Sequence, residues 1–444
     1  MKVPEKPPKF NYPKLGSVKD LNSLMEVLAK SNASVAKDKY LHWDKLRRYS
    51  SPKGLSHEEW WFALKLQRMS QYKAMPLIDK DSKTFKYLIL DQISEILHKI
   101  DQGAGGFIQM PEQITNPDMK DQYYISSLIQ EAITSSQLEG AVTTREIAKE
   151  MIRTGRPPRD RSEQMILNNF ITMQRIGKLK DETLSKELVF EIHKIVTEKT
   201  LDDPSAAGRF RNQNEKVVVS DMYNEVFHTP PPAEQLEERM SDLCDFANGS
   251  APNYFIHPVI RSIILHFWLA YDHPFVDGNG RTARALFYWS MLHHGYWLFE
   301  FISISQSILA APVKYYRAFL YTETDDNDLT YFILYHLDMI KRSIEELHKY
   351  IKHKTEQLQD LELRIQGLST LNYRQRALIG HALRHPHQRY TFKSHQMSHN
   401  VVYETSRSDL LYLEKLGLIK GRKIGKTWQF TPASNLENKL ADLA

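Results

Sequence analysis

Hydrophobic residues recur at three- and four-residue spacing along most of the chain, a period that predicts helices rather than strands. The first such stretch starts at Ser17, with Leu21, Leu24, Met25 and Leu28 on one face. Further helices are expected at about 57–71, 121–138, 161–176, 185–199, 233–248, 258–272, 281–294 and 328–362. The pattern therefore predicts a mainly α fold.

Short polar signals mark where some of these helices begin and end. The segments Ser56–Glu59 and Thr143–Glu146 have the Ser/Thr-x-x-Glu pattern of a capping box, which opens a helix. Glu139 and Gly140 close the helix expected at 121–138, so that the whole segment is about 121–140, and Gly140 suits the left-handed conformation that commonly ends a helix.

One β-hairpin signal stands in the middle of the chain. The segments Lys216–Ser220 and Glu225–His228 are rich in β-branched and aromatic residues and flank a turn at Asp221–Asn224. The run Pro230–Pro232 ends the hairpin, because proline cannot donate to a strand ladder.

Changes in composition divide the chain into three parts. Residues 1–16 carry prolines (Pro4, Pro7, Pro8 and Pro13) among lysines and indicate an extended lead-in. The glycine-dense stretch 102–106 indicates a boundary. We expect an N-terminal helical domain at 1–105, a central domain at 106–360 and a C-terminal domain at 365–435.

Charge is unevenly distributed along the 444 residues, whose net charge is +5 from 59 basic and 54 acidic side chains. Residues 366–432 hold 11 Lys and Arg against 3 Asp and Glu, a surplus of +8, so the remainder carries −3. This asymmetry indicates two functions on one chain and suits contact with a polyanion in the C-terminal part.

Cys244 is the only cysteine, so neither an intrachain disulfide nor a multi-cysteine metal site can form. No apolar stretch reaches the roughly 18 residues that span a bilayer, and no apolar leader opens the chain. These features predict a cytoplasmic protein with no membrane partner.

The candidate chemistry lies in residues 273–284, His-Pro-Phe-Val-Asp-Gly-Asn-Gly-Arg-Thr-Ala-Arg. Pro274 ends the preceding helix, and the Gly-Asn-Gly turn can form a nest of backbone N–H groups that binds an anion. A helix starts near Arg281, and its dipole favours an anion at the same place. Arg281 and Arg284 lie on neighbouring helix positions and suit a polyphosphate.

Two further side chains complete this candidate site. Asp277 offers a hard oxygen ligand for Mg²⁺ bridging phosphates, and His273 can take a proton near neutral pH. Each feature also has a structural interpretation: a tight helical corner, an Asp277 cap and a core His273. Their occurrence together in one short segment favours a functional site.

Residues 273–284 resemble the Fic family signature, HPFx[D/E]GNGRxxR, at every defined position. Gly208–Arg211 is similar to the family's G-x-[FY]-R element, and Ser303–Ser305, Tyr315–Tyr316 and Asp328–Thr330 look like its downstream helices. The resemblance covers about residues 120–350. It implies a Fic helical bundle with a β-hairpin flap, between an N-terminal helical region and a C-terminal winged helix-turn-helix.

The resemblance implies transfer of AMP from ATP to a Ser, Thr or Tyr hydroxyl of target proteins, or of the chain itself, with release of pyrophosphate. His273 would be the general base, and Asp277 would hold Mg²⁺. Gly278, Asn279 and Gly280 would form the anion hole, with Asn279 also binding the α-phosphate.

The same resemblance assigns the remaining parts of the site. Arg281 and Arg284 would bind the β- and γ-phosphates, and Phe275 would be buried and anchor the loop. The hairpin edge, at Val217, Val218 and Val219, would hold the target segment by strand addition.

The kinase-like Doc branch has lysine in place of the motif's second glycine, so Gly280 favours adenylylation over phosphorylation. Tyr315 and Tyr316 match a tyrosine pair that lines the nucleotide pocket in relatives, and core aromatics on a helix are an equally supported interpretation. The signature does not set the base, so another donor such as UTP stays an alternative.

The segment Ser135–Gly140 matches the family's inhibitory pattern, [S/T]xxxE[G/N], upstream of the Fic core. The resemblance implies that Glu139 pairs with Arg284 and so occupies the guanidinium that the γ-phosphate needs, with Ser135 opening the pattern. In some relatives the same glutamate helps to remove AMP, so de-AMPylation stays an alternative.

The basic C-terminal segment has the order of a winged helix-turn-helix and resembles that family by pattern. Helices are expected at 374–385 and 398–416, with a second element between them and two strands around a basic turn at 420–430. Thr405, Ser406 and Arg407 would face a DNA groove, with Lys423 and Lys426 on the wing.

Winged helices also bind proteins and dimerise, so a protein partner and a homodimer stay open beside DNA. The alternative function from a different class is a DNA-binding regulator whose Fic core senses nucleotide.

Overall fold

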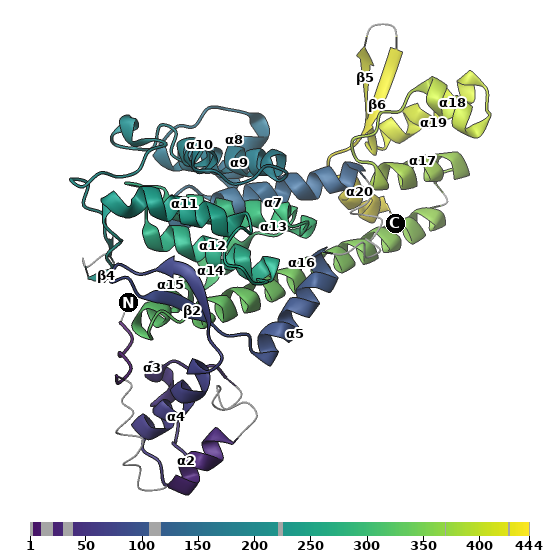
Figure 1. The fold of residues 1–444 in the computed structure, drawn as a ribbon. Helices are drawn as coiled ribbons and strands as arrows, with labels where there is room; N and C mark the ends of the chain where they lie inside the picture. The colour runs from purple at the N-terminus through teal and green to yellow at the C-terminus, as the bar shows by residue number, and fades with distance from the viewer. Residues whose placement is uncertain are drawn as a thin grey trace. The chain divides into compact units, whose positions relative to one another are not determined.

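The computed structural model describes residues 3–9, 21–29, 39–105, 117–220, 225–368, 370–424 and 427–443, and these are mainly helical (Figure 1). The predicted fold class is confirmed. They form two compact units, Met1–Gly106 with Leu128–Ile344 and Phe107–Ser127 with Glu345–Ala444. Pro13, the Asp221–Asn224 turn and Lys426 lie outside the described residues. Within the described ranges no helix is both long enough and apolar enough to cross a bilayer.

The first unit begins with a small helical part around buried tryptophans. Its helices are α2 (Leu21–Leu28), α3 (Trp43–Leu46), α4 (His57–Met69) and α5 (Asp91–Ile100), with α5 continued by a π-helical turn at Asp101–Gly105. The predicted capping box at Ser56 is present: its hydroxyl accepts from the Glu59 N–H at 3.2 Å, and the Glu59 carboxylate accepts from the Ser56 N–H at 2.7 Å. Trp60 and Trp61 are buried in this part.

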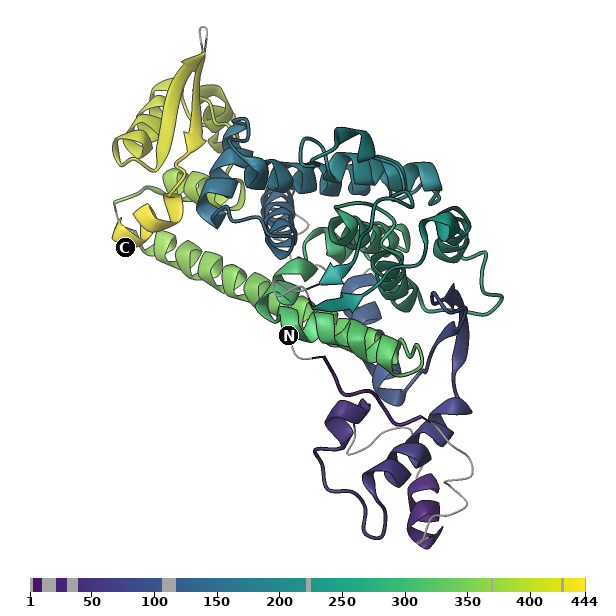
Figure 2. The ribbon, with the colours of Figure 1, turned by 90° about the vertical axis from the view of Figure 1, so that its left-hand side faces the viewer.

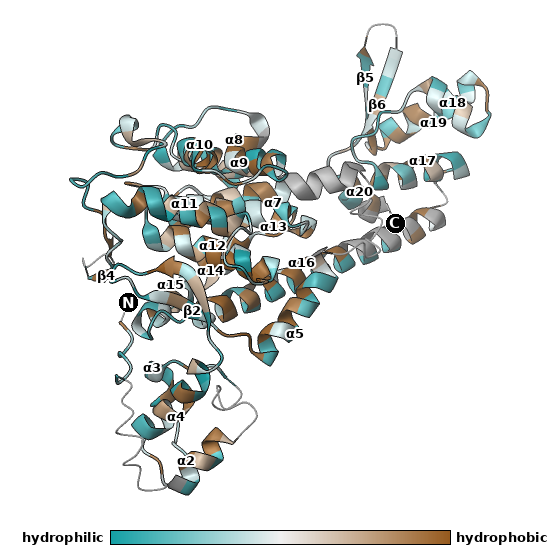
Figure 3. Ribbon diagram, in the orientation of Figure 1, coloured by the Kyte–Doolittle hydropathy of each residue, from teal (hydrophilic) through white to brown (hydrophobic). Residues whose placement is uncertain are grey.

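A β-hairpin also lies in the region predicted to be an N-terminal helical domain, and it was not predicted from the sequence. Strands β1 (Lys73–Ile78) and β2 (Thr84–Tyr87) pair antiparallel. The side chain of Asp79 closes the turn by accepting from the N–H groups of Asp81 and Lys83, both at 2.8 Å. Helix α5 follows this hairpin in the chain. Hydrophobic and hydrophilic residues alternate along it (Figure 3), and its apolar face is buried.

Helices form most of the rest of the first unit, with α12 and α13 at its centre (Figure 1). Residues 259–269 of α12 and 281–292 of α13 are all buried. The helices are α8 (Arg145–Thr154), α9 (Arg161–Leu179), α10 (Lys186–Val196), α11 (Leu236–Ala247), α12 (Pro258–Asp272), α13 (Asn279–His293), α14 (Ile304–Ala310) and α15 (Pro312–Thr324). Short 3-10 turns lie at Pro204–Ala206, Ala233–Gln235 and Trp297–Glu300.

The capping box predicted at Thr143 is wrong by one residue. Thr144 is the N-cap of α8, and its hydroxyl accepts from the Ile147 N–H. Glu146 is then the second helical residue instead of the third, so the reciprocal bond of a capping box cannot form.

Two long helices, α7 (Pro117–Leu138) and α16 (Thr330–Gly367), are divided between the units. The second unit also contains α17 (Tyr373–Arg384), α18 (Phe392–His399), α19 (Tyr403–Lys415), β5 (Ile419–Ile424), β6 (Thr427–Pro432) and α20 (Leu436–Leu443). The order of three helices and a hairpin agrees with the prediction, and α20 was not expected. Figure 2 shows the β5–β6 hairpin beside these helices. In its antiparallel ladder Ile419 pairs with Pro432 and Ile424 with Thr427.

One residue predicted to face a DNA groove lies in the core of this unit. Ser406 is fully buried, and its hydroxyl donates to the carbonyl of Phe392 at 2.5 Å. It therefore joins α19 to α18, whereas Arg407 beside it is exposed.

Candidate active site

The loop between α12 and α13 carries the candidate chemistry and is bent at two left-handed residues. His273 ends α12 with φ 46°, and Gly278 precedes α13 with φ 82°. A Cβ atom at position 278 would lie 2.6 Å from Cγ2 of Thr197, so both the backbone angle and the space require glycine.

An aromatic stack fixes the middle of this loop. Phe275 is buried, as expected, and lies under the ring of His193 with centroids 3.7 Å apart. Nδ1 of His193 accepts from the Gly208 N–H at 3.0 Å, so Nε2 carries the proton and donates to the Asp277 carbonyl at 2.9 Å.

The side chain of Asn279 also holds the loop. Its oxygen accepts from the Phe275 N–H at 2.9 Å and its nitrogen donates to the Phe275 carbonyl at 2.8 Å. Both ends of the Asn279 amide are therefore occupied by hydrogen bonds to the backbone of Phe275. A phosphate at the Gly-Asn-Gly turn would meet backbone N–H groups of the first turn of α13, which lack intrahelical partners.

His273 is oriented as a proton acceptor. Nδ1 lies 3.2 Å from the Ala270 carbonyl, which can only accept, so Nδ1 carries the proton and Nε2 keeps its lone pair. Burial lowers the pKa of His273 to about 4, which keeps the ring neutral at pH 7. Arg211 donates to the His273 carbonyl at 2.9 Å and steadies the same turn.

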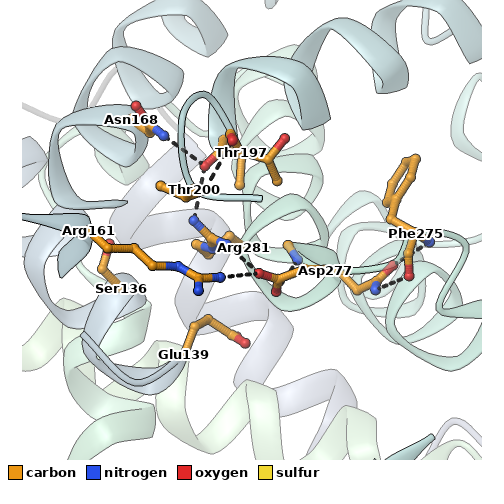
Figure 4. A network of polar contacts seen from close by, with 12 residues as sticks. Ser136, Glu139, Arg161, Asn168, Thr197, Thr200, Phe275, Asp277 and Arg281 are labelled. Carbon is orange, nitrogen blue, oxygen red and sulfur yellow. Dashed lines mark hydrogen bonds and ion pairs between the residues drawn. The ribbon is translucent and has the colours of Figure 1, made fainter. Parts of the chain in front are cut away.

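Two arginines approach Asp277 from different elements (Figure 4). Its Oδ2 lies 3.5 Å from Nη2 of Arg161, at the start of α9, and 3.7 Å from Nη2 of Arg281. Arg281 is buried and donates to the Val196 carbonyl at 3.0 Å, while its Nε and Nη2 have no hydrogen-bond partner among the described residues. Its buried guanidinium is thus available to an anion.

The pair expected to inhibit the site is brought together. Nη2 of Arg284 donates to Oε1 of Glu139 at 2.8 Å and to the Ser135 carbonyl at 2.9 Å, and Nε donates to the Ser135 hydroxyl at 2.8 Å. Burial alone would lower the pKa of Arg284, but the charge and hydrogen bond of Glu139, together with Tyr315 and Glu131, outweigh it and leave the pKa above its usual value. A Cβ atom at Gly280 would collide with the Glu139 carboxylate.

Polar contacts hold the end of α7 in this position. Oε2 of the buried Glu131 accepts from the hydroxyls of Tyr288 and Ser303, both at 2.8 Å. Asn169 of α9 donates to the Ser136 hydroxyl at 3.0 Å. These bonds fix the helix that carries Glu139 against the core.

A cavity of about 590 Å³ opens onto part of this site, whereas Asp277, Asn279 and Arg281 are not among its lining residues. His273, Gly280, Glu139 and Arg284 lie on its walls. Its other lining residues are largely apolar or aromatic, which suits a nucleobase.

Tyr315 and Tyr316 both line this cavity, with ring centroids 5.4 Å apart. Tyr315 is also a core residue, because it is only 5% exposed and its hydroxyl lies 2.9 Å from Nε2 of His266. The two interpretations of this residue are therefore compatible.

The predicted hairpin covers one side of the cavity. Strands β3 (Val219–Ser220) and β4 (Val226–His228) pair antiparallel. Val218 and Val219 line the cavity, whereas Val217 is not among the lining residues and lies outside the strand.

Sequence reasoning missed several side chains of the site. Arg161 was not singled out, although it reaches Asp277, and neither was His193 beneath the loop. Both belong to helices distant in sequence, and no local pattern marks them.

The donor set near Asp277 fits Mg²⁺ only when phosphates complete it. Within the described ranges no group of three His, Cys, Asp or Glu side chains could hold a metal ion. Mg²⁺ is commonly bound by one or two carboxylates together with substrate phosphates and water. Asp277, whose side chain is 43% exposed beside the Gly-Asn-Gly turn, is a carboxylate of that kind.

Comparisons with known proteins agree with this geometry. Residues 183–291 match the model of the Fic/DOC family. The chain is 28% identical over 218 residues to protein adenylyltransferase Fic of Nematostella vectensis, covering 49% of this chain and 46% of that protein. It is 29% identical over 181 residues to protein adenylyltransferase fic-1 of Caenorhabditis elegans, covering 40% of this chain and 33% of that protein.

Among solved structures, the chain is similar to a Fic family protein from Desulfovibrio desulfuricans G20. The TM-score is 0.53 at 21% identity, and the match covers 79% of this chain and 98% of that one. This likeness supports the fold. The family resemblance seen in the motif is thus confirmed, and the chain spans less than half the length of the two curated relatives it matches.

Proposed function

We propose that this protein, which carries a Fic domain at residues 183–291, is a self-inhibited protein adenylyltransferase. It would transfer AMP from ATP to a Ser, Thr or Tyr hydroxyl and release pyrophosphate. The observation that carries the proposal is the meeting of His273, Glu139 and Arg284 at one cavity of about 590 Å³. The adenylyltransferase names of the relatives support the same reaction.

The nucleotide would bind with its base against Tyr316 and the exposed edge of Tyr315, and with its phosphates at the start of α13. First-turn N–H groups there lack intrahelical partners and can bind an anion. Arg281 offers guanidinium nitrogens without a hydrogen-bond partner among the described residues, beside its ion pair with Asp277 at 3.7 Å. Asp277 would hold Mg²⁺, which would neutralise part of the charge on the leaving pyrophosphate.

His273 would remove the proton of the target hydroxyl through Nε2. The hydroxyl oxygen then forms a bond to the α-phosphorus as the bond to the β-phosphate oxygen breaks. Charge grows on pyrophosphate during this step, and Arg281 and Arg284 would stabilise it.

Self-inhibition would follow from the use of Arg284 by Glu139. While the carboxylate holds Nη2 at 2.8 Å, the γ-phosphate meets a negative charge in place of a free guanidinium. ATP would then bind weakly or in an unproductive pose.

The target segment would add as a strand to the edge of the β3–β4 hairpin. Val218 and Val219 line the cavity next to His273, so a segment paired there would present its hydroxyl to the base. Backbone pairing of this kind carries little sequence preference.

The test is labelling of purified protein and of a cell lysate by the Glu139→Gly variant. ATP labelled on the α-phosphate should mark protein, and ATP labelled on the γ-phosphate should not. His273→Ala in the same background should abolish labelling and keep ATP binding. Transfer from the γ-position would identify a kinase, and preferred use of UTP would identify another nucleotidyltransferase.

A second candidate activity is contact of the C-terminal unit with duplex DNA. Strand β5 carries Lys420, Arg422 and Lys423, all exposed, and a basic hairpin is the element with which winged helices touch phosphates. Fluorescence anisotropy with a duplex between 50 and 200 mM salt should show affinity that falls with salt. Replacing the three residues by alanine should make the affinity for DNA less dependent on salt. If no DNA binds at low salt, a protein partner is the remaining candidate for this unit.

A further inference from the structure

The β3–β4 hairpin is too small to hold its own position. Only Val219–Ser220 and Val226–His228 form its ladder, and a two-stranded hairpin is marginally stable in water. A side chain that ties it to the core therefore decides where its edge lies. His228 is directly opposite Val219 in the ladder.

His228 ends the hairpin inside the molecule and contacts two other elements. Its Nδ1 lies 2.7 Å from Oε2 of Glu323, in α15, and its Nε2 lies 2.7 Å from the carbonyl oxygen of Tyr271, in the last turn of α12. Its ring centroid is 4.6 Å from that of Tyr271, and the residue is buried.

Both atoms that face the ring nitrogens accept hydrogen bonds. A carbonyl oxygen has no proton to give, and an ionised carboxylate has none either. A neutral imidazole has a single N–H, so one of the two contacts would set a lone pair against a lone pair. The two short distances are satisfied together only by an imidazolium ring, whose charge also suits the negative end of α12.

We infer that His228 is a positioning residue for target binding: its protonated ring bridges Glu323 and the Tyr271 carbonyl and so fixes β4, and with it the Val219 edge, beside His273. The inference rests on the proposed role of the hairpin in holding the target segment. It assigns His228 no part in the chemical step.

The surrounding charges make Glu323 the counter-ion of this ring. Asp272 of α12 is also near, but Arg239 of α11 neutralises it in a 2.5 Å ion pair. His273, one residue further, is kept neutral by its own burial.

The pair of contacts from His228 to Glu323 and to the Tyr271 carbonyl is called the His228 clamp. Its strength depends on pH, because it requires a protonated ring. Burial by itself lowers the pKa of His228 and is the largest single influence, but the bond and charge of Glu323, the Tyr271 carbonyl and the charge of Asp272 together outweigh it and leave the pKa above its usual value. A group whose pKa is raised in the folded state contributes fully below its unfolded pKa, about 6.5. The clamp is complete there and is lost as pH rises through the raised value.

Hydrogen exchange measures hairpin anchoring without nucleotide or target, so it is independent of the transferase activity. Amides of residues 216–220 and 225–228 are compared at pH 6.5 and 9.5 after correction for intrinsic rates. His228→Gln can make one of the two bonds and carries no charge. It should exchange about tenfold faster or more at pH 6.5, since a charge-assisted bond exceeds a factor of ten in an equilibrium, and should show no further change at pH 9.5.

Two further measurements guard this test. The half-buried His294, whose Nδ1 faces the Ser290 carbonyl, gives a matched control, and His294→Gln should leave hairpin exchange unchanged. Glu323→Gln keeps the histidine but removes its counter-charge, and should also speed exchange if His228→Gln does not fold.

The protonation state is read directly from nitrogen-15 shifts of labelled histidines. At pH 6.5, below the raised pKa, both ring nitrogens of His228 should be mainly protonated in the wild type, and one only in Glu323→Gln. A singly protonated ring in the wild type, or unchanged hairpin exchange in both variants, would overturn the inference. If a variant loses the His228 clamp but still labels itself, the anchoring of the hairpin is distinct from the proposed transferase reaction.

Discussion

Replacing Glu139 by glycine should switch the protein on, because the substitution removes one bond to Arg284 and leaves the others. Arg284 keeps its bonds to the hydroxyl and the carbonyl of Ser135, at 2.8 and 2.9 Å. The guanidinium therefore stays in place, and the N–H of Nη2 that bonded the carboxylate becomes free to bind a phosphate oxygen. A γ-phosphate no longer has to displace that carboxylate.

The size of the effect follows from the bond that ATP must otherwise break. A hydrogen bond to a charged group contributes about 1.5–3 kcal/mol, which corresponds to roughly 10- to 150-fold in an equilibrium at about 1.4 kcal/mol per factor of ten. Arg284 is buried but the Glu139 side chain is 29% exposed. Solvent weakens such a pair, so we expect the lower half of this range.

The assay is initial-rate self-labelling with α-labelled ATP, at ATP concentrations that bracket the apparent KM. A lower KM would show that Glu139 weakens ATP binding, and a higher kcat would show that it misdirects the phosphates. Glu139→Gln keeps an acceptor without charge and should fall between wild type and glycine.

Glu139→Ala separates loss of the carboxylate from loosening of the chain. Alanine removes the same group without the backbone freedom of glycine, so it should activate to a similar degree. Activation by glycine alone would refute the ion-pair argument, and no rise in either variant would refute self-inhibition through this contact.

Three further outcomes follow from the site and its supports. In the activated variant the transfer rate should stay level from pH 6 to 8, because burial lowers the pKa of His273 to about 4; an acid limb near pH 6.5 would contradict a buried neutral base. Arg161→Ala should tighten Mg²⁺ binding measured by calorimetry with a non-hydrolysable nucleotide, because it removes a guanidinium 3.5 Å from Asp277; unchanged affinity would place the metal elsewhere. Asp325→Asn should lower the free energy of unfolding by about 3–5 kcal/mol, because buried Lys65 loses its buried carboxylate at 2.7 Å and is left with the exposed Asp326 at 3.4 Å; an unchanged Tm would contradict this.

Local signals predicted the parts of the fold that a short stretch of sequence encodes. The helix expected at 258–272 is α12 to the residue, because an apolar run between two prolines defines both of its ends. The cap at Ser56 was likewise readable from four residues. The β1–β2 hairpin was not, because Pro76 interrupts its first strand and charged residues form its turn.

Contacts between distant segments explain what the sequence could not show. Arg161 reaches Asp277 across 116 positions, and His228 meets Glu323 across 95. Neither pair leaves a period or a spacing that identifies its partner. The pairing of Glu139 with Arg284, 145 positions apart, was expected only from family resemblance.

The groups that would restrain the enzyme differ from the group that would perform the chemistry, and this separates the two leading functions. Glu139 acts on the phosphate side through Arg284, whereas His273 takes the proton on the target side. A double variant, Glu139→Gly with His273→Ala, should bind ATP as tightly as the single glycine variant and transfer nothing. If cells respond equally to both variants, nucleotide occupancy is the signal and the chain acts as a regulator; if only the single variant acts, the transfer reaction is the function.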